Sequence, residues 1–313
     1  MAVVKKVLLI VNPCSGKTSK RKSAEEIISM FPQTGYEFTV KKTERSGHAT
    51  ELVRQFAAGH DLIVCAGGDG TLNETINGMM EQEPRVPVGY IPMGSTNDFA
   101  TTLGIPSEPQ KAVDIIVSGH MNWYDIGQFN NRYFQYVASF GACTKASYAT
   151  SQKLKNIFGH AAYIMNGLTE WKDIKPIPLR IEYDGNVIED EVFLGAVSNS
   201  TSVAGLFKFD TNRVRLDDGT FEILLVRKMK NLLEAPVLLH KIRKMDYDGK
   251  QIFFTEAKSV KITSPNPIAW TLDGEYGGES TETNISNLCR SIRIYSPENP
   301  LFSTKCEAEE TTA

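Results

Sequence analysis

The sequence lacks the cysteine and histidine patterns that hold disulfide frameworks or zinc ions. Its cysteines are odd in number and form no CxxC pair: they are Cys14, Cys65, Cys143, Cys289 and Cys306. Its five histidines form no HxH or HExxH motif. This usage favours reduced thiols in a cytoplasm and excludes a disulfide-stapled secreted domain.

Long apolar runs and a strong charge of either sign are also missing. No run of about 18 apolar residues occurs, so no segment is predicted to span a membrane. Residues 1–6 are too short a lead, and Asn12-Pro13 follows the first apolar run too soon, for a signal peptide. The net charge of −3 argues against bulk binding to nucleic acid. We therefore expect a cytoplasmic protein whose contact with any membrane is peripheral.

The stretch from Val64 to Glu74 carries the clearest chemical signal. Residues 61–66 are apolar and predict a buried parallel strand, and the residues after Thr71 predict a helix closed by Gly78. The glycines between them allow a backbone to approach a bulky anion, which the helix N-terminus would attract. Asp69 stands where a phosphate-bound Mg²⁺ needs a carboxylate. A tight turn with an incidental aspartate is the alternative interpretation.

Three similar junctions follow other predicted strands, over residues 6–11, 36–42 and 87–91. They are Asn12–Gly16, which lacks the first glycine of a Walker A loop, the turn that begins at Thr43, and Pro92–Ala100. Helical spacing separates these strands at residues 19–31 and 49–58. Four repeats of strand and helix predict a doubly wound α/β fold, a parallel sheet with helices on both faces and ligands beyond its carboxyl edge.

From residue 122 the pattern changes to alternating strands, which predicts a β-rich second domain, a β-sandwich. Expected strands cover 123–129, 133–139, 179–183, 187–197, 214–216, 221–226, 259–262 and 291–295. Residues 154–171 look helical, and the acidic tail after Ser303 is expected to be disordered. We expect domains at 1–121 and 122–295; a return of about 296–313 to the first domain is left open.

Three stretches together resemble the diacylglycerol kinase catalytic family of soluble bacterial lipid kinases. They are Gly67-Gly68-Asp69-Gly70-Thr71, Gly94-Ser95-Thr96-Asn97-Asp98 with Phe99-Ala100, and Leu272-Asp273-Gly274-Glu275. The first is shared with NAD kinases; the combination is more specific. The resemblance covers nearly the whole chain and implies an ATP-binding α/β domain followed by a β-sandwich domain for the lipid.

The resemblance also implies the residues of an ATP site with Mg²⁺. The nucleotide would be lined by Asn12, Pro13, Cys14, Ser15, Gly16, Thr43, Gly68, Asp69, Gly70, Thr71, Leu72, Asn73, Glu74 and Thr96. The carboxylates of Asp69, Asp98 and Asp125 would surround the ion, in part through water. A helix-capping role is the alternative for Asp98.

A second, structural Mg²⁺ is implied at Arg215-Leu216-Asp217-Asp218-Gly219-Thr220. The family's loop maps the side chain of Asp218 and the carbonyls of Arg215 and Thr220 onto that ion. Asp-Gly is also a common hairpin turn, and the two interpretations are compatible.

Glu275 is the predicted catalytic base. Phosphoryl transfer to an alcohol needs a group that accepts the hydroxyl proton. The resemblance gives Glu275 that role, with Asp273 orienting it or the second domain. A solvated glutamate beside a plain turn is the alternative.

Two basic segments, 227–230 and 241–244, flank apolar residues between 232 and 239. Six cations around an apolar centre suit an anionic membrane surface. An ordinary surface helix interrupted by Pro236 is the alternative.

The sequence as a whole predicts a lipid kinase that uses ATP and Mg²⁺ and makes phosphatidic acid from diacylglycerol. A sphingoid base or another lipid alcohol is an alternative acceptor. A NAD kinase and a nucleotide-binding regulator without turnover are alternative functions. A homodimer is left open.

Overall fold

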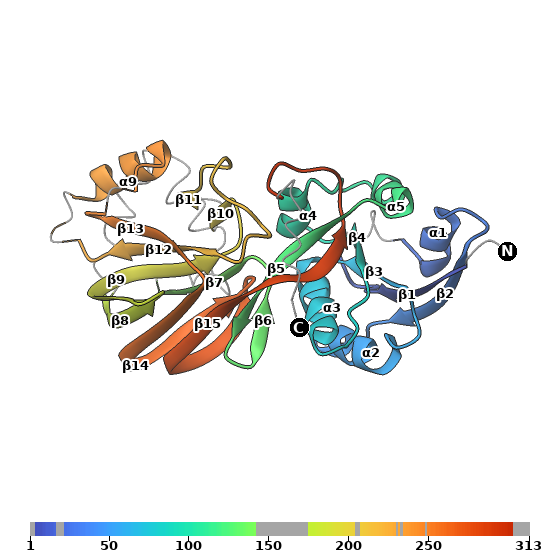
Figure 1. The fold of residues 1–313 in the computed structure, drawn as a ribbon, viewed down its shortest axis with the longest axis horizontal. Helices are drawn as coiled ribbons and strands as arrows, with labels where there is room; N and C mark the ends of the chain where they lie inside the picture. Colours follow the sequence, from blue (N-terminus) through green and yellow to red (C-terminus); the bar gives the residue numbers. More distant parts are fainter. Residues whose placement is uncertain are drawn as a thin grey trace, which may run out of the picture. The chain divides into compact units, whose positions relative to one another are not determined.

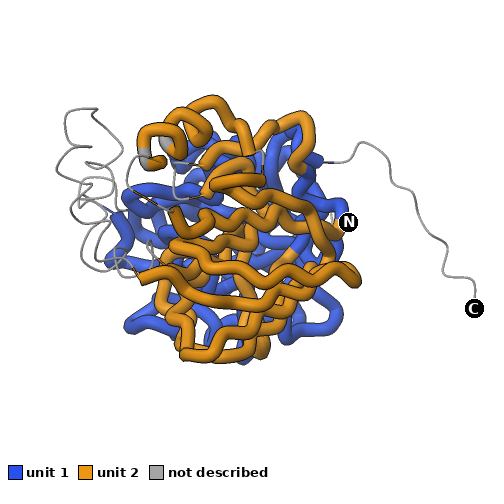
Figure 2. Tube along the Cα trace, turned by 90° about the vertical axis from the view of Figure 1, so that its left-hand side faces the viewer, with its two compact units in different colours: residues 1–125, 215–218, 289–313 blue, residues 126–214, 219–288 orange. Residues whose placement is uncertain are grey.

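The computed structural model describes residues 4–16, 22–141, 175–203, 207–229, 231, 234–247 and 249–302. The helix expected at 154–171 and the disordered tail expected after Ser303 lie outside these residues, as does Lys230. The chain forms two compact units. Unit 1 comprises Met1–Asp125, Arg215–Asp218 and Cys289–Ala313, and unit 2 comprises Ile126–Val214 and Gly219–Leu288 (Figure 2). The domain limits expected from the sequence stay a prediction about which segments fold by themselves.

Unit 1 is built on a parallel sheet whose strand order is β2-β1-β3-β4. The strands are β1 (Lys5–Val11), β2 (Tyr36–Lys42), β3 (Leu62–Gly67) and β4 (Val88–Pro92) (Figure 1). The end of β15 (Glu275–Tyr295) adds a further parallel partner, with Ile294 beside Val88. β3 is an inner strand of the parallel sheet and is buried along its whole length, and this burial explains its unbroken apolar sequence.

Helices connect the strands of this sheet (Figure 1). They are α1 (Ala24–Ser29), α2 (His48–Phe56), α3 (Asp69–Met80), α4 (Asp98–Leu103) and α5 (Pro109–Ser118). Local chemistry explains several of their ends. Ser23 and Glu26 form a capping box at the start of α1, and Gly104 and Gly119 end α4 and α5 in the left-handed conformation.

The expected end of α3 at Gly78 is wrong, because the helix continues to Met80. Gly78 has a packing role instead. A Cβ at this position would lie 2.7 Å from the Val53 Cβ and 2.8 Å from the Thr50 carbonyl oxygen of α2. The glycine therefore lets α2 and α3 approach closely and does not terminate the helix.

Unit 2 is rich in strands, as expected, with the order β13-β12-β9-β7-β14-β15. Its strands include β6 (Arg132–Phe134), β7 (Val137–Gly141), β8 (Ile177–Tyr183), β9 (Asn186–Ser198), β10 (Ser202–Val203), β11 (Phe207–Lys208), β12 (Phe221–Arg227), β13 (Ile252–Ala257) and β14 (Ser259–Leu272). β5 (Met121–Phe129) and β15 each run from one unit into the other. The strands β7 and β8 both pair with β9 and with β14, each along a different part of these two long strands.

The core of unit 2 is aromatic. Trp270 is fully buried, with its ring centroid 5.0 Å from Phe129 and 4.6 Å from Phe140, and Phe134 stacks on Phe221 at 5.5 Å. Side chains of β5, β6, β7, β12 and β14 thus share one core, which is the apolar driving force for folding this unit.

Two expectations for this part of the chain are wrong. Residues 214–216 form no strand; the Leu216 N–H donates to the Leu301 carbonyl at 2.9 Å, within unit 1. Pro236 does not interrupt a helix, because it lies in the first turn of α9 (Ala235–Lys244), where a missing N–H has no cost.

Candidate functional site

Four loops meet at the carboxyl edge of the unit 1 sheet. In the strand register, Val11 is the partner of both Lys42 and Ala66, and Gly67 is the partner of Pro92. The first residue after each strand extends this ladder, because Thr43 donates its N–H to Val11, Asn12 to Ala66 and Met93 to Gly67, at 2.9, 2.9 and 2.7 Å. The junctions singled out in the sequence therefore lie side by side.

The loop of Asn12–Gly16 is bonded to the start of α3. The Asn12 Nδ2 donates to the Thr71 Oγ1 at 2.8 Å, and the Gly68 N–H donates to the Ser15 Oγ at 3.1 Å. Ser15 is thereby engaged with the other loop. The N–H groups of Asp69, Gly70 and Thr71 stand in the first helical turn, where no intrahelical acceptor is available, and these are the donors that could meet a phosphate.

Close backbone packing explains two glycines of the site. Gly16 has φ +69°, and a Cβ there would lie 2.1 Å from the Met93 carbonyl oxygen. A Cβ at Gly94 would lie 2.7 Å from the Gly68 Cα. Any side chain at these positions would push the loops apart.

Asp69 joins the start of α3 to the start of α4. Its Oδ2 accepts the Asp98 N–H at 3.1 Å and its Oδ1 accepts the Phe99 N–H at 3.3 Å. Burial raises the pKa of Asp69 above its usual value, the two N–H donors oppose that rise, and the nearby charge of Asp98 adds to it. Asp69 and Asp98 are thus brought together, as predicted. Asp98 is the first residue of α4, after the N-cap Asn97, and is exposed.

Asn97 shapes the loop of residues 94–98, and the sequence interpretation gave it no role of its own. It adopts φ +56°, its Nδ2 donates to the Gly94 carbonyl at 3.0 Å, and its Oδ1 accepts the Gly94 N–H at 2.9 Å. An asparagine before a helix is a known signal for such local bonding. The adjacent Thr96 is exposed at the same loop.

The other residues predicted to bind the nucleotide differ in their exposure and in their hydrogen bonds. Cys14 is exposed and donates its N–H to the Asn12 Oδ1 at 2.9 Å. Leu72 is fully buried in the core, so its side chain does not face the edge of the sheet. The Asn73 Oδ1 accepts from Asn77 Nδ2 at 3.1 Å, along α3. Pro13 is exposed beside Cys14.

The carboxylate of Glu74 is bound by the start of α2. Its Oε1 accepts the Gly47 N–H at 2.7 Å, and its Oε2 accepts the Ala49 N–H at 3.1 Å. Thr43, at the head of the same loop, is buried.

Asp125 lies with the segment 215–218. It is fully buried, its Oδ1 accepts the Arg290 N–H at 2.7 Å, and its own N–H donates to the Leu216 carbonyl at 2.9 Å. The Arg290 guanidinium in turn contacts the Asp217 carboxylate at 3.3 Å. Asp125 thus lies beside the predicted structural-metal loop.

Within that loop, Asp218 is exposed and Arg215 is half-buried. The carbonyl of Thr220 accepts from the Asn287 Nδ2 at 2.9 Å. Across the part of the chain that the structure describes, no three His, Cys, Asp or Glu side chains gather closely enough to hold a metal ion.

In unit 2, Asp273 and Glu275 flank the β14–β15 turn but have different surroundings. The Asp273 carboxylate accepts three N–H groups, from Gln135 at 2.7 Å and from Tyr136 and Val137 at 3.0 Å each. Asp273 therefore fixes the turn between β6 and β7. Glu275 begins β15, where it is the strand partner of Leu272, and is exposed; its carboxylate has no hydrogen-bonded or ionic partner among the described residues.

Three of the six basic side chains that were predicted to face a membrane form ion pairs within the protein. Arg227 pairs with Asp190 at 2.5 Å, Lys228 with Glu191 at 2.8 Å, and Lys241 with Asp246 at 4.0 Å. Arg243 and Lys244 remain exposed at the end of α9. Leu238 and Ile242 form the buried side of this helix.

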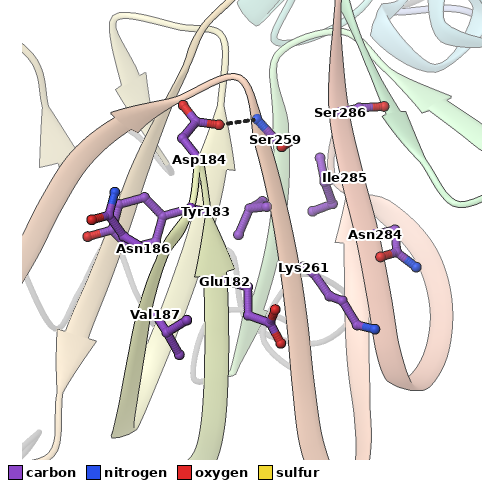
Figure 3. A pocket seen from close by; sticks show the side chains of 12 residues that line it. Glu182, Tyr183, Asp184, Asn186, Val187, Ser259, Lys261, Asn284, Ile285 and Ser286 are labelled. Carbon is purple, nitrogen blue, oxygen red and sulfur yellow. Dashed lines mark hydrogen bonds between the residues drawn. The ribbon is translucent and has the colours of Figure 1, made fainter.

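A separate pocket at the β8–β9 hairpin contains none of the predicted site residues (Figure 3). Its lining includes Asp184, which accepts the Ser259 N–H at 3.2 Å, and Lys261, which pairs with Glu282 at 3.1 Å. Because these polar groups are already bonded, the pocket adds nothing to the candidate site.

No helix among the described residues has the length and apolar character needed to cross a bilayer.

Comparison with known proteins gives consistent matches over both parts of the chain. Residues 6–129 match the diacylglycerol kinase catalytic domain, and residues 137–294 match the YegS C-terminal NAD kinase beta sandwich-like domain. The chain is 37% identical over 297 residues to the diacylglycerol kinases of Staphylococcus aureus (strain bovine RF122 / ET3-1) and Staphylococcus epidermidis (strain RP62A), covering 94% of this chain and 93% of each relative.

Solved structures agree with these matches. A crystal structure of a diacylglycerol kinase from Bacillus anthracis str. Sterne aligns with a TM-score of 0.69 and 26% identity, covering 94% of this chain and 97% of the other.

Proposed function

The chain belongs to the diacylglycerol kinase catalytic family and is a lipid kinase, and we propose that it transfers the γ-phosphoryl group of ATP to diacylglycerol. The products are phosphatidic acid and ADP. The observation that carries this proposal is the meeting of four loops at one edge of the parallel sheet, with α3 presenting its first N–H groups there. The doubly wound arrangement, with helices on both faces, is the form of this domain that we propose.

The loops supply the groups that a nucleotide triphosphate needs. The N–H groups of Asp69, Gly70 and Thr71 bind phosphate oxygens, since a helix N-terminus favours negative charge. The exposed hydroxyl of Thr96 and the backbone of Asn12–Gly16 bind further along the nucleotide. The bonds from Asn12 to Thr71 and from Gly68 to Ser15 hold these groups in register before ATP arrives.

Asp69 and Asp98 fit a Mg²⁺ that travels with ATP. Their negative charges lie near each other, and part of the rise in the pKa of Asp69 comes from Asp98, so a cation would relieve the repulsion. Mg²⁺ is held by one or two carboxylates together with phosphates and water, so a cluster of three acidic residues is not required. The ion, when bound, neutralises charge on the transferring phosphoryl group.

Glu275 accepts the proton of the acceptor hydroxyl. An exposed carboxylate without a partner is available to a substrate, whereas Asp273 is already bound by three N–H groups. The lipid oxygen forms a bond to the γ-phosphorus, the bond to the bridging oxygen of ADP breaks, and the hydroxyl proton passes to Glu275.

We further propose that the protein works in the cytoplasm and touches the membrane peripherally. Support comes from α9, in which Arg243 and Lys244 are exposed in the last turn and Val237, in the first turn, is 45% exposed. A helix that exposes cations and an apolar side chain suits anionic headgroups. Binding to vesicles that contain phosphatidylglycerol, and not to pure phosphatidylcholine, checks this part separately.

The experiment that tests the proposed function is an acceptor panel. The purified chain is incubated with γ-labelled ATP and Mg²⁺, and with diacylglycerol, sphingosine, ceramide or NAD in turn. Labelled phosphatidic acid as the main product supports the proposal. Label on sphingosine or ceramide would keep the lipid kinase and change its substrate, and no label on any lipid would overturn the proposed function.

A further inference from the structure

We propose that Glu74 is a positioning residue that aligns the loop of residues 43–47 with the phosphate-binding start of α3, rather than a direct contact of the nucleotide. This inference rests on the proposed function, because it concerns the same ATP site. It assigns a different role from the one that the sequence resemblance implies for Glu74.

The first step is that both oxygens of Glu74 are occupied within the protein. Oε1 accepts the Gly47 N–H at 2.7 Å and the Ser46 hydroxyl at 3.4 Å, and Oε2 accepts the Ala49 N–H at 3.1 Å. In addition, the Thr50 hydroxyl donates to the Glu74 carbonyl at 2.8 Å. An ATP phosphate would gain nothing from this anion and would be repelled by it.

The second step is that α2 has no cap of its own. Its N-cap is Gly47, with φ +79° and no side chain, so a carboxylate from α3 takes the place of the usual Ser, Thr, Asn or Asp. The carboxylate also lies at the positive end of the helix dipole. Glu74 is therefore a cap supplied from another helix.

The third step is the geometry of α3, which uses one face to hold its neighbours. Thr71 accepts from Asn12, Glu74 binds the start of α2, Gly78 admits the backbone of α2, and Glu81 just beyond the helix receives Arg54 at 2.6 Å. Their spacings of 3, 4 and 3 residues place them on one side of the helix. α2 and α3 lie side by side (Figure 1).

These contacts fix the position of the loop of residues 43–47, which forms one side of the proposed nucleotide site. The loop of 43–47 is held at one end by the bond from the Thr43 N–H to Val11 and at the other by Glu74. Glu74 lies one helical turn after the N–H groups of Asp69 and Gly70. It thus fixes the distance between Thr43 and the phosphate-binding turn without touching ATP.

The test measures ATP affinity by calorimetry, and KM and kcat by turnover, for Glu74→Ala and Glu74→Gln in the full chain. We expect Glu74→Ala to raise the Kd and KM for ATP about tenfold with a smaller change in kcat. Without the Glu74 carboxylate, the loop of residues 43–47 is ordered only when ATP binds, and the free-energy cost of ordering it weakens binding. Glu74→Gln keeps one acceptor oxygen and should recover part of the loss.

Glu81→Gln is the matched control. It weakens the Arg54 contact on the same helix face, away from the loop, and should lower thermal stability without changing the KM for ATP. If Glu81→Gln raises that KM as much as Glu74→Ala does, Glu74 has only a general packing role and the inference fails.

A double-mutant cycle with Gly47→Ala separates positioning from direct contact. Alanine is strained at φ +79° but has space, since the nearest atom to its Cβ would be 4.0 Å away, so this change strains the backbone where the loop joins α2 without a steric clash. Non-additive effects of the two changes on ATP affinity support positioning. Additive effects would mean that Glu74 meets ATP directly. If the unmodified chain binds no ATP, the proposed function fails, and not this inference alone.

Discussion

The carboxylates of this chain differ in what already binds them. Asp69, Glu74 and Asp273 each accept backbone N–H groups from a different element, 25 to 138 residues away in sequence. Asp98 and Glu275 are exposed. A carboxylate that accepts two or three N–H groups is held in place, whereas an exposed one can move to meet a substrate or an ion. At the scale of single residues, positioning and chemistry are thus divided between different acids.

Asp69 gives a prediction about pH. Because the pKa of Asp69 is raised in the folded chain, its ionisation costs stability as the pH rises from about its usual value of 3.8 to above the folded pKa. Asp69→Asn removes that ionisation. The melting temperature of Asp69→Asn relative to the unmodified chain should therefore increase between pH 4 and pH 7, while lipid phosphorylation is lost.

Thermal melts over this pH range, with kinase assays at pH 7, check both halves. A difference in melting temperature that falls with pH would mean that the folded chain stabilises the ionised Asp69, which is the opposite of the effect of burial. Retained activity would remove Asp69 from the phosphate site.

The β14–β15 hairpin gives a prediction at the scale of one element. Asp273→Ala leaves three N–H groups without their acceptor, of which those of Gln135 and Val137 belong to buried residues. The free energy of unfolding should fall by on the order of 3 kcal/mol. Chemical denaturation measures this change.

Asp184→Ala is the control, because the chain repeats the same arrangement at the β8–β9 hairpin. Asp184 also precedes a glycine, has φ +41°, and accepts the N–H groups of Lys258 and Ser259, but it is exposed. Its removal should cost about 1 kcal/mol or less. Equal losses for the two variants would show that burial of the bonds at Asp273 has no effect.

The segment of residues 215–220 gives a second prediction at this scale. If Asp218 and the carbonyls of Arg215 and Thr220 hold a structural Mg²⁺, the ion stabilises the folded state by mass action. The unmodified chain and Asp184→Ala should then melt a few degrees higher in Mg²⁺ than in chelator, and Asp218→Ala should lose this difference. A Mg²⁺ effect that persists in Asp218→Ala would leave the segment as a plain turn.

Local patterns predicted the elements whose burial is uniform along the chain. β3 and residues 7–11 of β1 are buried without interruption, and their apolar runs are visible in the sequence. Gly78 and Pro236 misled the prediction because each has a position-dependent meaning: one admits a neighbouring helix and the other begins a helix. The apolar residues Val214 and Leu216 resemble part of a strand in the sequence. Both are buried, but neither belongs to a strand.

At the scale of the whole molecule, the sequence predicted the four loops of the site because all of them follow parallel strands. The register of such a sheet brings the ends of its strands together wherever they stand in the chain. It did not predict that Asp125 lies beside residues 215–218, because bonds between Asp125, Leu216 and Arg290 join residues up to 165 positions apart. Contacts of this kind leave no periodic signal.

The most direct test of the central claim, a lipid kinase with Glu275 as its base, is to compare Glu275→Gln with the unmodified chain. Glutamine keeps the size of the side chain but cannot accept a proton at neutral pH. We predict that turnover of diacylglycerol falls about a hundredfold or more, while ATP affinity measured by calorimetry stays the same. A variant that keeps its turnover, or that loses ATP binding in proportion to its rate, would contradict the account.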